Sequence, residues 1–169
     1  MSTLKVNRIE PRTGDTVEIV GLDITSNDAA CRAHLGNTQL APKNVVGKIN
    51  MDVVDFDTKS WWDPVNLRYI PQESGYYLVI VKLSLQDSTQ DNGQHAIVAK
   101  NGVMVSGSYR MNQAGANHTS YTQDIVYCNG TSDYIEPYGE NGANDGSWTN
   151  TSPYNQGDNA YISITKVAS

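Results

Sequence analysis

The segment Gly75–Leu85, GYYLVIVKLSL, constrains the fold more than any other part of the chain. Alternate residues from Tyr77 to Leu85 are apolar, and a period of two is that of a β-strand, whose side chains point to opposite faces in turn. The other face of the segment is also apolar at its start, at Tyr76, Leu78 and Ile80. We therefore expect a central strand that is covered on both faces.

The same period of two recurs along most of the chain after residue 28, and no long stretch has the 3.6-residue period of a helix. The predicted strands cover residues 30–36, 44–51, 67–70, 95–100, 103–111, 119–127, 134–138 and 160–167. In the first of them, ACRAHLG, we expect Cys31, Ala33 and Leu35 to face the core. Asn101-Gly102 separates two such segments and favours the type I′ turn of a hairpin. About eight to ten strands without a helix predict an all-β sandwich or jelly roll.

The composition argues against two classes of partner. Of the 169 residues 18% are charged, the formal net charge is −6 and the pI is near 4.9. Lys and Arg are not clustered, so we predict no nucleic-acid partner. No window approaches the ~20 apolar residues of a membrane span, and the first residues lack the apolar centre of a leader peptide. We expect neither membrane insertion nor a cleaved leader.

The two cysteines, Cys31 and Cys128, each lie inside an alternating apolar run. We favour two buried thiols, but a disulfide between them stays open because sequence alone does not place their Cα atoms. Neither cysteine belongs to a Cys-x-x-Cys motif or a Cys/His cluster, so no zinc site is predicted.

No sequence motif for catalysis is present. The chain lacks Gly-x-Ser-x-Gly, a phosphate-binding glycine loop and His-Glu-x-x-His. Its histidines, His34, His95 and His118, are isolated from one another and from carboxylates at ligand spacing. We expect no catalytic residue, no metal and no cofactor, and hence a protein that is not an enzyme. Calcium remains an alternative at two polar loops with the oxygen ligands Asp87, Asp91, Asn92, Glu140, Asn141, Asn144 and Asp145.

Residues 139–159, GENGANDGSWTNTSPYNQGDN, form the longest segment without a strand pattern. Long loops in compact domains are usually functional or ordered by a partner. Trp148 lies in its middle, where a large apolar ring is exposed to water unless something covers it. We predict Trp148 and Tyr154 as contacts to a receptor or partner, either a neighbouring subunit or a host glycan.

The segment Leu67–Tyr77, LRYIPQESGYY, resembles the aromatic-x-x-Pro…Gly-x-Tyr signature of the C1q/TNF-like jelly-roll superfamily. ACRAHLG, HAIVAKNG, CNGTSDYIEPY and AYISITKV resemble further strands of that family in the same order, so the resemblance covers about residues 29–167. It implies a jelly-roll head over residues 29–169. It also implies core and trimer-forming roles for Tyr69, Pro71, Gly75, Tyr77, Val79 and Val81.

Residues 3–22, TLKVNRIEPRTGDTVEIVGL, resemble the short N-terminal segments of tailed-phage fibre and virion surface proteins. The resemblance implies that residues 1–28 are a virion-attachment arm and linker, and bacteriophage versions of the C1q-like module usually form homotrimers. The apolar positions expected to attach the arm to phage capsid or tail proteins are Leu4, Val6, Ile9, Val17, Ile19 and Leu22.

Together these features predict a non-enzymatic bacteriophage virion protein on the particle surface. Only a few residues separate Leu22 from the first strand of the head, so the chain has no repetitive shaft of the kind a long fibre needs. This spacing favours a homotrimeric capsid decoration or cement protein. The alternative is a short tail-fibre or receptor-binding adhesin that contacts a host surface glycan or protein.

Overall fold

The computed structural model describes residues 29–86, 92–112, 118–142, 146–149 and 160–169 of the chain. No helix in these ranges is long and apolar enough to cross a membrane. The backbone there forms strands joined by turns. The strands are β1 (Ala30–His34), β2 (Gln39–Ala41), β3 (Val46–Lys48), β4 (Val53–Asp57), β5 (Trp62–Asp63), β6 (Arg68–Tyr69), β7 (Ser74–Gln86), β8 (Asn92–Lys100), β9 (Val103–Asn112), β10 (His118–Asn129), β11 (Ile135–Asn141), β12 (Gly146–Trp148) and β13 (Tyr161–Ala168).

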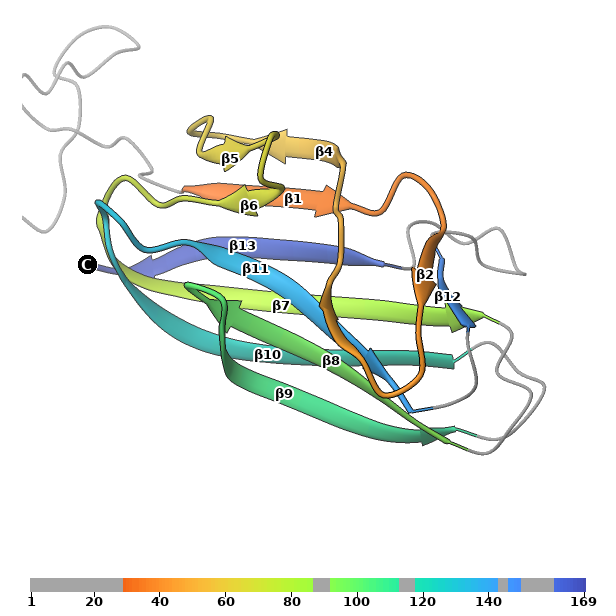
Figure 1. Cartoon of the computed structure of the whole chain (residues 1–169). Helices are drawn as coiled ribbons and strands as arrows, with labels where there is room; N and C mark the ends of the chain where they lie inside the picture. The colour runs from red at the N-terminus through yellow and green to blue at the C-terminus, as the bar shows by residue number, and fades with distance from the viewer. Residues whose placement is uncertain (1–28, 87–91, 113–117, 143–145, 150–159) are drawn as a thin grey trace, which may run out of the picture.

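The strands form two sheets that face each other (Figure 1). Sheet A has the order β2-β12-β7-β13-β1-β4, and β10 pairs with the other edge of β7. Sheet B has the order β5-β6-β11-β8-β9, and β3 also pairs with β11. The named strands pair antiparallel, and most neighbours in a sheet are far apart in the sequence, as in a jelly roll. The predicted all-β jelly-roll sandwich is confirmed.

The core lies between the sheets and is centred on the predicted inner face of β7. Tyr77, Val79, Val81, Leu83 and Leu85 are all fully buried. The buried residues around them come from both sheets and include Cys31, Ala33, Leu35, Ala96, Val98, Ile135, Ile162 and Ile164. The inward face predicted for the first strand is therefore confirmed. Burial of this set supplies most of the stabilisation, because apolar area removed from water dominates folding.

The second face of β7 differs from the prediction. β7 is central in its pairing, with β10 on one edge and β13 on the other. However, sheet B packs on only one side of sheet A, so Tyr76 is 46% exposed and Leu78 and Ile80 are half-buried. The expectation that this strand is covered on both faces is wrong for the single chain.

The Asn101-Gly102 turn joins β8 to β9 as predicted. Both residues have positive φ, 54° and 75°, which a type I′ turn requires. The Asn101 side chain also binds the segment between β10 and β11. Its Nδ2 donates to Asp133 Oδ1 (2.7 Å), and its Oδ1 accepts from the backbone nitrogen of Tyr134 (2.9 Å). One residue therefore sets a hairpin and anchors the start of β11.

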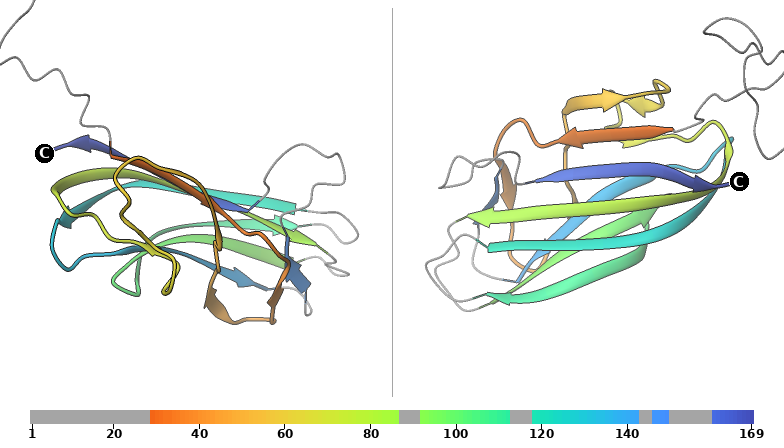
Figure 2. Two further views of the ribbon diagram at one scale, coloured as in Figure 1. Left: turned by 90° about the horizontal axis from the view of Figure 1, so that it is seen from above. Right: turned by 180° about the vertical axis from the view of Figure 1, so that it is seen from behind.

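Both ends of the described head lie at the same end of the sandwich, as Figure 2 shows. β1 pairs with β13 from Ala30 opposite Thr165, and the backbone nitrogen of Lys166 donates to the carbonyl oxygen of Ala29 (2.9 Å). β2 and β12 lie at the opposite end. Ala29, the first described residue, therefore lies beside the C-terminal strand.

Gly130 follows β10 at a φ of 74°, in the left-handed region that favours glycine. A Cβ at this position would collide with the backbone of Glu73 and Ser74. We expect Gly130→Ala to lower the free energy of unfolding by about 2–4 kcal/mol, from φ strain and overpacking together. Urea denaturation measures this loss. Gly47→Ala is the matched control because a Cβ at Gly47 has nothing within 4 Å, and equal midpoints for the two variants would contradict this account of Gly130.

Candidate functional site

The outer surface of sheet A carries an apolar patch on β7 and β10. We call it the tyrosine face and define it as Tyr76, Leu78, Ile80, Ile125 and Tyr127. Tyr127 lies opposite Tyr76 in the register, and Ile125 lies opposite Leu78. Ile125 is 57% exposed and Tyr127 49%, and the rings of Tyr76 and Tyr127 are 5.4 Å apart. Contiguous exposed apolar surface of this kind marks interaction sites.

A second apolar row lies on β9, the edge strand of sheet B, close to the end of β10. We call it the apolar edge and define it as Val103, Met104 and Val105, all exposed in the single chain. Lys100, at the end of β8, donates from Nζ to the carbonyl oxygen of Tyr127 (2.8 Å). This bond ties the apolar edge to the border of the tyrosine face.

A charged cluster occupies the outer surface of sheet A on the far side of β13. Asp55 of β4 contacts Arg32 Nη1 (3.1 Å) and His34 Nδ1 (2.8 Å) of β1, and the Arg32 guanidinium lies 4.6 Å from the ring centroid of Tyr161. The tyrosine face is therefore flanked by polar residues on this side. Such a polar rim around an apolar centre is the usual anatomy of a protein interface.

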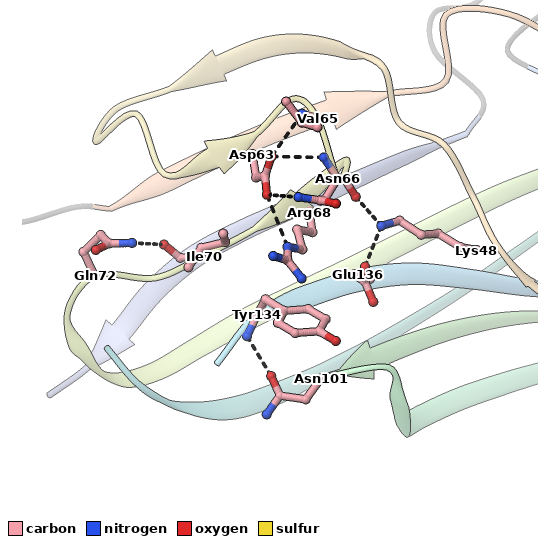
Figure 3. Close-up of polar contacts among 10 residues, drawn as sticks. All are labelled: Lys48, Asp63, Val65, Asn66, Arg68, Ile70, Gln72, Asn101, Tyr134 and Glu136. Atoms are coloured by element: carbon pink, nitrogen blue, oxygen red, sulfur yellow. Dashed lines mark hydrogen bonds and ion pairs between the residues drawn. The ribbon is translucent and has the colours of Figure 1, made fainter. Parts of the chain in front are cut away.

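The outer surface of sheet B carries a polar network that begins with a tight turn after β5, shown in Figure 3. The Asp63 carboxylate accepts from the backbone nitrogens of Val65 and Asn66 (both 3.0 Å), from Asn66 Nδ2 (2.8 Å) and from Arg68 Nε (3.3 Å). These donors, Asn66 first, lower the pKa of Asp63 to about 2. The turn presents Val65, which is 86% exposed, at its tip.

The same network fastens this turn to sheet B. Lys48 Nζ donates to the carbonyl oxygen of Asn66 and contacts Glu136 Oε1 (2.5 Å). The Arg68 guanidinium lies 4.3 Å from the ring centroid of Tyr134. We call Lys48, Asp63, Asn66, Arg68 and Glu136 the polar latch. It holds β3, β5 and β6 against β11, and its contacts are mutual, which is typical of a structural support.

The predicted family residues all lie inside the protomer. The buried set is Tyr69, Pro71, Gly75, Tyr77, Val79 and Val81. Tyr77 donates from its hydroxyl to the carbonyl oxygen of Glu73 (2.8 Å), and its ring lies 6.3 Å from that of Tyr69. These residues build the core, and the outward-facing residues of the same strand form the tyrosine face. In the sequence, this face is indicated by the apolar residues Tyr76, Leu78 and Ile80, which alternate with the core residues of β7.

The prediction that Trp148 contacts a receptor or partner is wrong. Its side chain is only 3% exposed, because β12 pairs with both β2 and β7 and places Trp148 opposite Leu85. The ring packs beside Gly139, where a Cβ would lie 2.9 Å from Trp148 Cζ2. Part of the predicted loop 139–159 is therefore strand, and it closes one end of the core. Tyr154 and the arm positions Leu4, Val6, Ile9, Val17, Ile19 and Leu22 lie outside the described residues.

The histidines are less isolated than their sequence spacing indicates. His34 contacts Asp55, and His95 Nδ1 contacts Glu140 Oε2 (3.0 Å) across neighbouring strands. Within the described ranges no three His, Cys, Asp or Glu side chains gather as metal ligands. Of the proposed calcium ligands, Glu140 is engaged with His95, and the buried Asn141 Nδ2 donates to the carbonyl oxygen of Ala41 (2.8 Å). Asp87, Asp91, Asn144 and Asp145 lie outside the described residues.

The cysteines are buried free thiols, as favoured from the sequence. Burial raises the pKa of Cys31 to about 12, with a further contribution from Asp57, and raises that of Cys128 to about 11. β1 and β10, which carry them, are separated in sheet A by β13 and β7. Their thiols are therefore structural and poorly reactive.

This burial predicts slow alkylation of the folded protein. Because only the thiolate reacts and both side chains are buried, iodoacetamide at pH 8 should modify both cysteines at least about 100-fold more slowly than in the urea-unfolded chain. Mass spectrometry of peptides from timed reactions measures both rates. Modification of either cysteine in the folded protein at the unfolded rate would contradict the placement described.

Comparison with known proteins finds the same architecture at low sequence identity. No family model matches the chain, and no curated protein matches it. Murine APRIL at pH 5.0 aligns with a TM-score of 0.60 and 13% identity over 83% of this chain and 99% of its own. Eiger TNF from S. frugiperda aligns with a TM-score of 0.57 and 12% identity over 83% of this chain and 93% of its own. The globular domain of the zebrafish complement 1qA protein aligns with a TM-score of 0.56 and 8% identity over 82% of this chain and 95% of its own. The head has the C1q/TNF-like jelly-roll fold. At these identities the likeness shows the fold of the jelly-roll head alone.

Proposed function

We propose that the protein is a non-enzymatic structural subunit of a bacteriophage virion. It acts as a homotrimeric capsid decoration or cement protein. Residues 1–28 attach it to the particle, and the jelly-roll head faces outward. The observation that carries the proposal is the tyrosine face. An apolar surface on β7 and the edge strand β10 of sheet A, exposed in the single chain, is suited to a permanent contact with another subunit.

The positions of the apolar surfaces favour a closed ring. The tyrosine face lies on sheet A, and the apolar edge lies on β9 of sheet B. Packing the face of one subunit on the edge of the next is a heterologous contact, which joins two different patches and closes into a ring at a suitable rotation. The resemblance to bacteriophage C1q-like modules supports three subunits in that ring.

The arm supports attachment to a larger particle. It joins the head at Ala29, beside the C-terminal strand, so three arms of a trimer would leave from the same end of the heads. Few residues lie between Leu22 and β1 (Ala30–His34), so the head would sit close to the surface that the arm binds. A short tether of this kind suits a protein that covers a capsid.

The alternative function is a short tail-fibre or receptor-binding adhesin. It is favoured by Val65, a highly exposed apolar side chain at the tip of a turn that the polar latch holds rigidly. A rigid apolar tip loses little conformational entropy when it contacts a host protein. Val65→Ser should weaken binding to host cells if this function is correct and leave particle binding unchanged.

Particle binding tests the main proposal. Purified full-length protein should bind phage particles assembled without it, whereas a variant lacking residues 2–22 should stay in solution with its head folded. A density map of the decorated particle then separates the two functions, because a cement protein occupies capsid positions and an adhesin occupies the tail. Equal particle binding by the two proteins would overturn the role of the arm.

A further inference from the structure

A groove of about 300 Å³ opens where the edges of the two sheets meet, between β9 and β10. The two strands are joined across it by Arg110 Nη1, which donates to the carbonyl oxygen of Thr119 (2.9 Å), and deeper along the strands by the Ser106 and Thr122 hydroxyls (3.3 Å). Its volume is at the lower end of the range for small-molecule sites. The lining residues are Ser108, Tyr109, Arg110, Thr119, Ser120 and Tyr121.

Ser120 lines the groove, and the buried side-chain amide of Gln94 holds its hydroxyl in place. Ser120 is 2% exposed, and its Oγ accepts from Gln94 Nε2 (2.9 Å). Gln94 is completely buried, and its Nε2 also donates to the carbonyl oxygen of Leu83 (3.0 Å). Because Ser120 accepts from Gln94, its own proton can be donated to an oxygen in the groove. A buried polar chain that ends at a groove is a feature of an organised binding site.

Two exposed tyrosines border the groove. Tyr109 and Tyr121 are 56% and 66% exposed, so their ring faces are accessible. Tyr109 is nevertheless fixed, because its ring occupies the space where a Cβ of residue 93 would be and stacks edge-on with His95 at 4.8 Å. Gly93 is thus required for this ring position. The Tyr109 ring therefore lies over β8, and Tyr121 supplies the exposed ring at the groove.

Arg110 gives the groove its charge preference. Its side chain is exposed beside the tyrosines, and the lining contains no acidic residue although the whole chain has a net charge of −6. A guanidinium binds a carboxylate through two parallel hydrogen bonds. Tyrosine rings suit the apolar C–H face of a pyranose, and serine and threonine hydroxyls suit its hydroxyl groups.

We propose that this groove binds a sugar acid, a pyranose that carries a carboxylate, as part of a glycan. The carboxylate pairs with Arg110, a tyrosine ring covers the sugar face, and Ser120 donates to a ring substituent. The groove lining belongs to β9 and β10 of one chain and includes no residue of the tyrosine face or of the apolar edge. It adds a ligand class that the adhesin function leaves unspecified.

Saturation-transfer NMR on the full-length protein tests this site with D-glucuronic acid, N-acetylneuraminic acid and, as neutral controls, D-glucose and methyl glucuronate ester, each at millimolar concentration. We expect signals from both acids and much weaker ones from the neutral sugars. Arg110→Gln should raise the apparent Kd for the acids about tenfold, and Arg110→Lys should recover part of the affinity. Lys43→Gln removes an exposed lysine at a site that is not part of the groove lining and should bind as the native protein does.

Tyr121→Ala adds a test of the ring contact, since it removes an exposed ring at the groove and leaves Arg110 in place. It should weaken binding of both acids several-fold. Equal signals from acidic and neutral sugars, no signal from any sugar, or unchanged binding in Arg110→Gln would each overturn the proposal. Sedimentation of the same samples reports the oligomeric state separately, so failure of sugar binding and failure of the trimer are distinguishable.

Discussion

Ile125→Asp should dissociate the proposed trimer into folded monomers. The Ile125 side chain is 57% exposed in the single chain and lies outside the core, so the variant should fold normally. In the trimer the new carboxylate would be removed from water without a partner, which costs roughly several kcal/mol for each interface. Over the ring we expect the association constant to fall at least about a thousandfold. Sedimentation velocity measures the change.

Val65→Asp is the matched control for this experiment. It also places a carboxylate at an exposed apolar position, but Val65 belongs to the turn after β5, on the other sheet. The control should sediment as the native protein does. If Ile125→Asp also kept the native sedimentation coefficient, the tyrosine face would not be the subunit interface.

Trp148→Ala should lower the free energy of unfolding by about 3–5 kcal/mol, because truncation of a buried Trp loses apolar contact and leaves a cavity. The ring packs against Gly139, and Trp148 lies opposite Leu85 at the end of β7. Urea denaturation at fixed protein concentration measures the loss. The concentration is kept constant because association contributes to the apparent stability.

Leu40→Ala is the control for the tryptophan. Leu40 lies on β2 beside β12, is 77% exposed, and should change stability by less than about 0.5 kcal/mol. A native urea midpoint for Trp148→Ala, together with lost binding to a partner, would restore the contact role that the sequence predicted.

The sequence predicted the fold well where local patterns decide it. The alternation in β7 determined which residues are buried, and Asn101-Gly102 determined a turn, because both depend on neighbours in the chain. Trp148 was misplaced because its cover comes from strands more than 50 residues earlier in the sequence. No local pattern in a Gly/Asn-rich segment reports such pairing.

The candidate sites were only partly visible in the sequence. The apolar positions Tyr76, Leu78 and Ile80 were recognised, but they were assigned to a covered face because a pattern does not show on which side the second sheet packs. The pairing of Ile125 with Leu78 required the register of β10 on β7. The groove between β9 and β10 depends on two sheets meeting at an edge, which is a tertiary property.

In the proposed assembly the tyrosine face joins three copies of this chain. Light scattering coupled to size exclusion measures the mass of the full-length protein in solution over a range of dilutions. We predict about 55 kDa, three times the 18.5 kDa of one chain, at micromolar concentration. A mass of one chain that persists at high concentration would show that the chain does not form this trimer.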